Sequence, residues 1–176
     1  MRLVGLCGWS GAGKTTLLAR LIPELRARGH KVATIKHAHH GFDIDKPGKD
    51  SYVHREAGAS EVLVASSRRW ALIHELRDEA EPSLSDLLSR LSPVHLVLVE
   101  GFKRDSHPKV EVYRAALGNP LLQPDDPCIR GVASDTRLNI AVPVLDLNDP
   151  TRIADFLLCI AMPIGEFRPG APGVSP

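Results

Sequence analysis

The chain has 176 residues, of which 43% are hydrophobic and 24% are charged, proportions that are ordinary for a globular domain. Its formal net charge of +1 argues against a surface built for nucleic acid or for an anionic membrane. No apolar run approaches the length that spans a bilayer, and the first residues resemble a core strand rather than a cleaved signal peptide. Cys7, Cys128 and Cys159 lie far apart among apolar neighbours, so we expect three buried thiols in a reducing cytoplasm.

Strand-like and helix-like segments alternate along the chain, which predicts a mostly parallel sheet with helices on both faces. In chain order the first half is expected to form a strand at 3–7, a helix at 16–28, a strand at 31–36, a short helix at 49–57 and a hairpin of strands at 61–66 and 70–75. The second half is expected to form a helix at 83–91, a buried strand at 94–100, strands at 109–114, 129–134 and 142–147, and a helix at 151–162. We assign residues 1–162 to one nucleotide-binding domain and the Pro- and Gly-rich residues 163–176 to a disordered tail.

Residues 8–15, GWSGAGKT, match the phosphate-loop pattern G-x-x-x-x-G-K-[ST] between a predicted strand and a predicted helix. Glycines let the backbone N–H groups of such a loop curl around phosphate oxygens, and the helix dipole adds positive potential there. Lys14 can reach the β- and γ-phosphates, and the Thr15 hydroxyl can bind Mg²⁺. We therefore expect a P-loop NTPase-like α/β three-layer sandwich that binds a nucleoside triphosphate. The loop residues expected to contact the nucleotide are Gly8, Ser10, Gly11, Ala12, Gly13, Lys14 and Thr15.

Glu100 ends the most apolar run of the chain and is followed by Gly101. In phosphate-loop proteins an acidic residue at the end of such a strand holds Mg²⁺, directly or through water. The usual residue is Asp, and Glu is one methylene longer. We therefore expect Glu100 either to contact the metal through water or to position a reacting water; a carboxylate that simply faces solvent is the alternative.

The segment after the second predicted strand is rich in histidine and aspartate. His37, His39 and His40 could bind zinc, but no cysteine or suitably spaced carboxylate accompanies them, so the rim of a nucleotide cleft is the favoured interpretation. Three carboxylates follow, at positions 43, 45 and 50, and Asp45 is our candidate to reach Mg²⁺ in the way switch loops do. Solvated loop carboxylates are the alternative interpretation.

Two further features are candidates for ligand contacts. Asp135 follows the strand predicted at 129–134, so it could accept hydrogen bonds from guanine N1 and N2, or it could cap a turn. Seven basic residues could contact phosphate or pterin, and Lys103 is favoured because it lies close to Glu100 in sequence. The seven are Lys46, Lys49, Arg55, Arg68, Arg69, Lys103 and Arg104.

Several stretches, taken in this order, resemble the MobB family of GTP-binding adaptor proteins of molybdopterin-guanine dinucleotide biosynthesis. They are residues 8–18 (GWSGAGKTTLL), 35–40 (IKHAHH), 45–51 (DKPGKDS), 56–59 (EAGA), 98–103 (LVEGFK), 108–114 (PKVEVYR) and 142–149 (VPVLDLND). The phosphate loop is shared by many families, whereas IKH, DKPGKDS and VEGFK in this order are far more specific.

The resemblance implies a homodimer that binds GTP and Mg²⁺ and hydrolyses GTP weakly at most. Such a protein would assist the guanylyltransferase that joins GMP to molybdopterin, and molybdopterin itself would be a further ligand. Carried over by matching position, the phosphate-binding residues are Gly11, Gly13, Lys14, Thr15 and Thr16, and Thr15 and Glu100 serve Mg²⁺.

Two other functions remain open from the residues themselves. A small-molecule kinase or efficient GTPase could use Arg68 and Arg69 as a lid or arginine-finger pair within a dimer. A metallochaperone-type GTPase could use the histidine cluster. The adaptor is favoured because no residue stands out as an activated base for an acceptor substrate.

Overall fold

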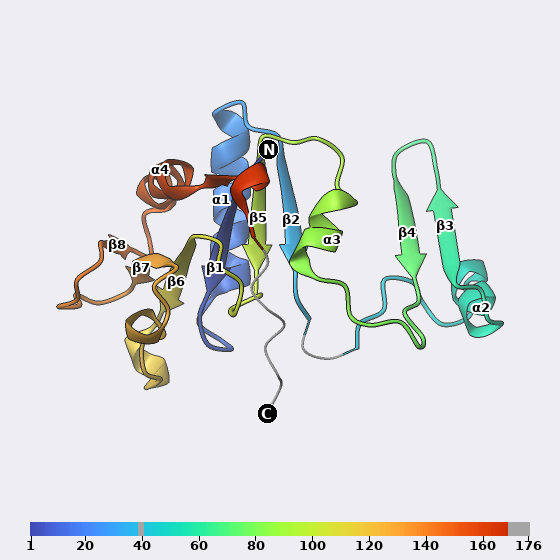
Figure 1. The fold of residues 1–176 in the computed structure, drawn as a ribbon, viewed down its shortest axis with the longest axis horizontal. Coiled ribbons are helices and arrows are strands. Elements are labelled where there is room, and N and C mark those ends of the chain that lie inside the picture. Colours follow the sequence, from blue (N-terminus) through green and yellow to red (C-terminus); the bar gives the residue numbers. More distant parts are fainter. Residues whose placement is uncertain (39–40, 169–176) are drawn as a thin grey trace. The chain divides into compact units, whose positions relative to one another are not determined.

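The computed structural model describes residues 1–38 and 41–168 (Figure 1). The chain forms two compact units, one built from residues 1–37 and from residue 83 onward, the other from Ala38–Pro82. The range assigned above to one nucleotide-binding domain is therefore interrupted by an inserted unit.

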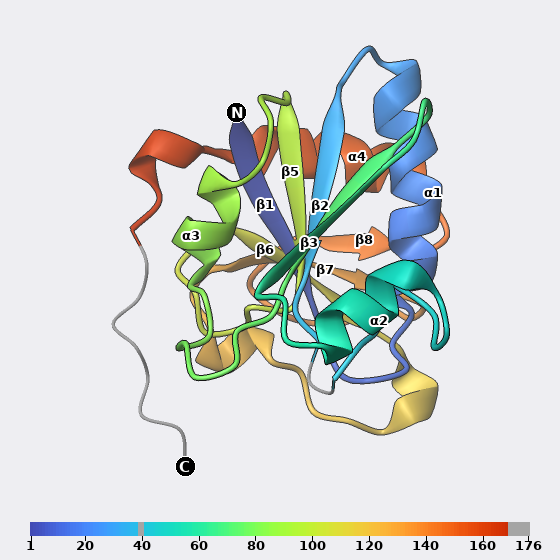
Figure 2. The same ribbon diagram turned by 90° about the vertical axis from the view of Figure 1, so that its right-hand side faces the viewer.

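The first unit is built on a mostly parallel sheet, as predicted, with the strand order β2-β5-β1-β6-β7-β8 (Figure 2). Strand β9 runs antiparallel to the others and pairs with the first residues of β1. The strands are β1 (Arg2–Cys7), β2 (Val32–Lys36), β5 (Leu96–Glu100), β6 (Lys109–Tyr113), β7 (Ile129–Ser134), β8 (Val144–Asp146) and β9 (Met162–Pro163). Because the six main strands are parallel, the loops that follow them all leave from one edge of the sheet.

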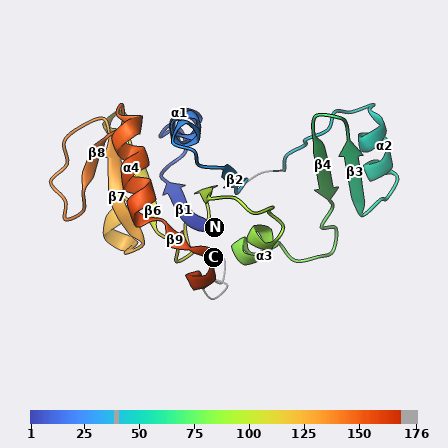
Figure 3. The same cartoon turned by 90° about the horizontal axis from the view of Figure 1, so that it is seen from above.

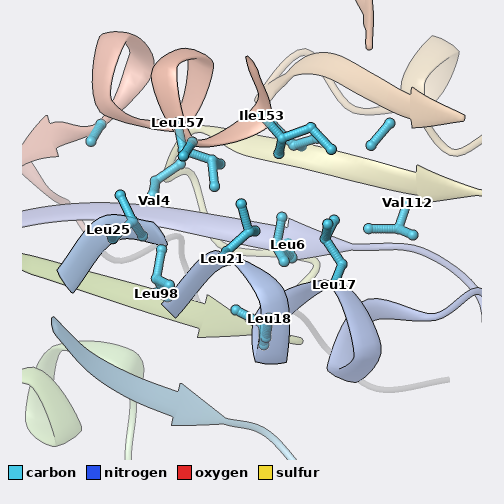
Figure 4. Packing of buried hydrophobic residues seen from close by; sticks show 14 of the residues in the cluster. Val4, Leu6, Leu17, Leu18, Leu21, Leu25, Leu98, Val112, Ile153 and Leu157 are labelled. Carbon is cyan, nitrogen blue, oxygen red and sulfur yellow. The ribbon is translucent and has the colours of Figure 1, made fainter. Parts of the chain in front are cut away.

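Helices cover both faces of this sheet. Helices α1 (Lys14–Ala27) and α4 (Pro150–Ile160) pack together on one face, and α3 (Leu84–Ser89) covers the other (Figure 3). The larger core joins leucines of α1, such as Leu21 and Leu25, to inward-facing residues of β1, β5, β6 and α4 (Figure 4). Helix α1 continues through Pro23. The sheet is thus a buried platform that holds the carboxyl ends of its strands in place.

The second unit contains α2 (Asp50–Glu56) and an antiparallel hairpin of β3 (Glu61–Ala65) and β4 (Trp70–His74). The hairpin was predicted from its two apolar runs. Helix α2 has no buried residue, and Val62 is the buried hydrophobic residue of the hairpin. Charged groups supply many of the contacts here, and Arg55 forms ion pairs with Asp43, Asp45 and Glu75.

The predicted disordered tail was wrong for residues 163–168. Residues 164–166 form a 3-10 turn, and the Phe167 side chain is 6% exposed in the core on the α3 face. The density of Pro and Gly suggested disorder, but β9 pairs with β1 and apolar side chains anchor the segment. Residues 169–176 lie outside the described part of the chain.

The expectation of three buried thiols holds only for Cys7. Cys128 is half-buried, and Cys159 is exposed on α4. Burial raises the pKa of Cys7 to about 12, so this thiol is inert at neutral pH. None of the helices that the structure describes is long and apolar enough to cross a membrane.

Candidate functional site

The carboxyl ends of β5, β1 and β6 lie side by side, because β1 pairs with both of the others. Residues 8–13 follow β1, Glu100 is the last residue of β5, and Arg114 follows β6. Ligands of open parallel sheets bind at this edge. The sheet topology therefore brings three segments, far apart in sequence, to one place.

The phosphate loop has the backbone geometry that its sequence pattern predicts. Gly8, Gly11 and Gly13 have φ angles of 136°, 78° and 97°, a region that favours glycine. A Cβ on Gly8 would lie 2.4 Å from the carbonyl oxygen of Val112, so this position also lacks space for a side chain. Helix α1 begins directly after Gly13, and its first N–H groups are free of intrahelical partners by geometry.

The Lys14 side chain folds back across the loop. Its ammonium donates to the carbonyl oxygens of Gly8 and Trp9, at 3.0 and 2.9 Å. Partial burial lowers the pKa of Lys14, and the Glu100 carboxylate acts in the opposite direction. The cation is thus held at the loop, where phosphate oxygens could replace the carbonyl partners.

Thr15 and Glu100 meet at the end of β5. The Thr15 hydroxyl donates to the Glu100 carboxylate, with distances of 3.1 Å to Oε1 and 3.3 Å to Oε2. Glu100 is 8% exposed, and the Lys36 ammonium lies 3.8 Å from Oε1, so this carboxylate does not simply face solvent. Adjacent oxygen ligands of an octahedral Mg²⁺ lie about 2.9 Å apart, given Mg–O distances of about 2.0–2.1 Å. The pair of residues therefore fits the metal, directly or through water.

The turn after β5 places Lys103 next to the phosphate loop. Gly101 and Phe102 both have positive φ, 95° and 48°, which reverses the chain at this point. The Lys103 ammonium lies 5.2 Å from the centre of the Trp9 ring, and Trp9 Nε1 donates to the Pro120 carbonyl at 2.7 Å. Of the seven basic candidates, Lys103 is therefore one that the structure brings to the loop.

His37 also lies at this edge, because its backbone N–H donates to the Glu100 carbonyl at 2.9 Å. Its ring packs against Phe102, with ring centres 4.8 Å apart. His39 and His40 lie outside the described residues. Within residues 1–38 and 41–168, no group of three or more His, Cys, Asp or Glu side chains is arranged to hold a metal ion.

Several predicted candidates belong to the second unit. Both carboxylate oxygens of Asp45 accept hydrogen bonds from Arg55, at 3.0 and 3.4 Å, and the Asp45 side chain is almost fully buried. Asp43 also accepts from Arg55, and Asp50 is the first residue of α2. Lys46, Lys49, Arg68 and Arg69 lie in this unit as well. A magnesium role for Asp45 stays a prediction.

Sequence reasoning missed Arg114, although it quoted the stretch that ends with this residue. Arg114 Nε donates to the carbonyl oxygen of Ala12 at 3.2 Å, and its Nη1 lies 3.6 Å from Asp135 Oδ2. The available signal was its position directly after a strand at the ligand-binding edge. Only the pairing of β6 with β1 shows that this position adjoins the phosphate loop.

A cavity of about 520 Å³ opens at the carboxyl ends of β7 and β8. Asp135 lines it, and Asp146 does so from the neighbouring strand, since Ser134 and Asp146 are register partners. Asp135 Oδ1 accepts a hydrogen bond from the Ala115 N–H at 3.1 Å. Asp146 was missed because the sequence alone does not show that β7 and β8 are neighbours. The other lining residues are Ser134, Thr136, Arg137, Leu138, Val144, Leu145 and Asn148.

Known proteins are similar to this chain in sequence and in fold. The family MobB, described as molybdopterin guanine dinucleotide synthesis protein B, matches residues 3–135. A molybdopterin-guanine dinucleotide biosynthesis adapter protein of Escherichia coli (strain K12) is 48% identical over 159 residues, which cover 89% of this chain and 91% of the relative. The protein of the same name from Haemophilus influenzae is 43% identical, over 88% of this chain and 86% of the relative.

The fold comparison agrees with the sequence comparison. A crystal structure of molybdopterin-guanine biosynthesis protein B superposes with a TM-score of 0.67 and 28% identity, and the match covers 89% of this chain and 98% of the other. The range matched by the family, residues 3–135, contains the phosphate loop, Glu100, Arg114 and Asp135. The chain belongs to the MobB family.

Proposed function

We propose that this chain is a GTP-binding adaptor protein of molybdopterin-guanine dinucleotide biosynthesis. The names of its relatives support the pathway, and the convergence of Lys14, Thr15 and Glu100 at the end of the parallel sheet carries the nucleotide assignment. The partner would be the guanylyltransferase that joins GMP to molybdopterin, and molybdopterin would be a further ligand. The protein would act in the cytoplasm and hydrolyse GTP weakly at most.

In this proposal the triphosphate lies in the loop. The N–H groups of the loop and of the start of α1 bind its oxygens, the Lys14 ammonium neutralises the β- and γ-phosphates, and Mg²⁺ is held by Thr15 and Glu100. Thr16 follows on the first turn of α1 as an additional phosphate contact. When phosphate oxygens replace the two carbonyl partners of Lys14, its hydrogen bonds become stronger, because both the ammonium donor and the phosphate acceptor are then charged.

The cavity between the ends of β7 and β8 is the proposed guanine site. Asp135 and Asp146 offer carboxylate oxygens there, and guanine N1 and N2 are hydrogen-bond donors. Adenine has an acceptor at N1, which would face a carboxylate unfavourably. This difference in donor pattern is the physical basis for preferring GTP to ATP.

An exposed apolar surface on the second unit supports a homodimer. Two strands form the hairpin, which pairs with no other strand of residues 1–38 and 41–168, and Trp70 is 66% exposed. Exposed edges and apolar side chains of this kind mark interaction sites. The large hydrophobic residues exposed in this unit are Phe42, Ile44, Val53, Leu63, Val64, Trp70 and Leu72.

Calorimetric titration of the full chain with GTP, GDP and ATP tests the nucleotide assignment. We expect GTP to bind more tightly than ATP, and Lys14→Ala to weaken GTP binding by roughly 10- to 150-fold, the equivalent of about 1.5–3 kcal/mol. Lys31→Ala is the matched control, because Lys31 is exposed at the opposite edge of the sheet and its loss changes the net charge equally. Equal affinities of the Lys14→Ala and Lys31→Ala proteins for GTP would refute the phosphate site.

The same titration with and without Mg²⁺ tests Glu100. Glu100→Gln should reduce GTP affinity in the presence of Mg²⁺ and change it much less in EDTA, because a neutral amide binds the cation weakly. A similar loss in both conditions would remove Glu100 from the metal shell. Turnover of about one GTP per second without a partner would contradict the adaptor and favour an enzyme.

A further inference from the structure

Arg114 occupies the junction between the two parts of the proposed nucleotide site. On one side its Nε donates to the Ala12 carbonyl of the phosphate loop at 3.2 Å. On the other side its Nη1 lies 3.6 Å from Asp135, which lines the cavity at the ends of β7 and β8. The side chain is 39% exposed, so the guanidinium is neither buried in a core nor extended freely into solvent.

The guanidinium is also placed close to the start of α1. An ideal Cβ on Gly13, the N-cap of this helix, would lie 3.4 Å from Arg114 Nε and 3.5 Å from Nη2. The first turn of α1 contains no acidic residue, and it begins with Lys14. A helix N-terminus carries partial positive charge, so two cations beside it repel that charge in the absence of an anion.

Asp135 compensates part of this charge, but its carboxylate is shared. Its Oδ1 accepts the Ala115 N–H at 3.1 Å, and the 3.6 Å separation from Nη1 is longer than a direct hydrogen bond. The guanidinium has five N–H donors in a planar fork, which suits two oxygen atoms of one phosphate. A polyanion in the loop would therefore relieve the repulsion between the two cations and the start of α1. It would also accept hydrogen bonds from the N–H groups of Arg114 that do not donate to the Ala12 carbonyl.

On the basis of the proposed function, we infer that Arg114 binds the phosphate chain of the nucleotide from the base side of the loop. Lys14 then holds the chain from within the loop, and Arg114 holds it at the end that leads to the β7–β8 cavity. Asp135 orients the guanidinium while it lines that cavity. Arg114 thereby makes the site select nucleotides over nucleosides and couples its phosphate end to its base end.

The test compares ligands that differ in their phosphate number. GTP, GDP and guanosine are titrated into the full-length wild type, Arg114→Ala and Arg114→Lys, with guanosine measured by displacement of a fluorescent GTP analogue. We expect Arg114→Ala to weaken the binding of GTP and GDP by about tenfold or more and the binding of guanosine by less than about twofold. Arg114→Lys should lie between wild type and Arg114→Ala, because it keeps the charge and loses the fork.

Arg130→Ala is the charge-matched control. Arg130 is exposed near the amino end of β7, at the opposite edge of the sheet, so the Arg130→Ala protein should bind GTP as tightly as wild type. Thermal unfolding of the free proteins shows whether each variant is folded. If Arg114→Ala does not fold, the ratio of GTP to guanosine affinity in Arg114→Lys decides the question.

An equal loss of GTP and guanosine binding in the folded Arg114 variants would overturn the inference, and so would no loss at all. If wild type itself binds neither GTP nor GDP, the proposed function fails first, which is a different result. Asp135→Asn alone and combined with Arg114→Ala tests the coupling. We expect the double variant to lose clearly less GTP affinity than the product of the two single losses, whereas a simple product would exclude coupling.

Discussion

The two units of this chain are stabilised in different ways. The first unit has a hydrophobic core on each face of a mostly parallel sheet, and the interior strand β5 is buried along its whole length. The second unit buries little apolar surface, holds Arg55 among three carboxylates and leaves Trp70 and Leu63 exposed. A rigid platform thus carries the proposed nucleotide site, and the inserted unit presents surface suited to contact with another protein.

A substitution that leaves a cavity in the larger core should lower the free energy of unfolding most. Leu21 on α1 is fully buried, so Leu21→Ala should lower the free energy of unfolding by about 2–5 kcal/mol. The same substitution at an exposed position of the hairpin, Leu63→Ala, should change the free energy of unfolding by less than about 0.5 kcal/mol. Chemical denaturation measures both. Equal effects would show that the two units do not differ in the way described.

The platform also contains a buried histidine that should make it sensitive to acid. His107 is fully buried, and within the described residues neither ring nitrogen has a hydrogen-bond partner. Burial lowers the pKa of His107 from 6.5 to about 3. Between these values the unfolded chain takes up a proton that the folded chain does not, so stability is complete above pH 6.5 and declines as the pH falls towards 3.

The expected slope from this one group is about 1.4 kcal/mol per pH unit. His107→Leu removes the titrating group. The difference in unfolding free energy between wild type and variant should therefore change by about 1.4 kcal/mol for each pH unit between about pH 6 and pH 4, which lie between the two pKa values of His107. Denaturation at several pH values measures it. Parallel pH profiles of the two proteins would mean that His107 is protonated in the fold.

Loss of the Arg55 guanidinium, which pairs with Asp43, Asp45 and Glu75, should destabilise the second unit alone. Arg55→Ala leaves Asp45 almost fully buried without its partner, so backbone amides of Ala38–Pro82 should exchange with solvent faster. Amides of β1 and β5 should keep their exchange rates. Hydrogen-exchange mass spectrometry resolves the two units, and Arg55→Lys tests whether charge without the fork suffices. Faster exchange in both units would show that they unfold together.

Only a small change in folding stability is expected from a substitution at Trp70. Trp70→Ser alters a largely exposed side chain, so the free energy of unfolding of the monomer should change by less than about 0.5 kcal/mol. If the hairpin forms the proposed homodimer, the same change should lower the dimer fraction in sedimentation experiments. Glu79→Gln, also in the second unit, serves as a control at a polar exposed position. An unchanged dimer fraction in Trp70→Ser would place the interface elsewhere.

The sequence predicted some features better than others for identifiable reasons. Short apolar runs predicted the strands, and the helix predicted from residue 83 begins there, where Ser83 and Asp86 form a capping box in the structure. The strand predicted at 109–114 did not reveal that Lys109 and Glu111 are both buried. Lys109 pairs with Asp126 at 2.8 Å, and Glu111 accepts the N–H groups of residues 122 and 123, so the partners come from a loop that local patterns describe poorly.

Arg114 illustrates the limit of prediction within the site. Its sequence neighbours show only that it follows a strand, whereas its contacts with Ala12 and Asp135 depend on strands that pair with β6 on either side. The cavity lined by Asp135 and Asp146 depends in the same way on the pairing of β7 with β8.

The local sequence determined the phosphate loop, because positive φ angles at glycine and the start of a helix are properties of neighbouring residues. It also determined that Glu100 would end a buried strand. Only the tertiary structure decided that β5 lies beside β1, which brings Glu100 to the hydroxyl of Thr15 across 85 residues of sequence. Strand order and register create contacts between distant segments, and no local pattern contains that information.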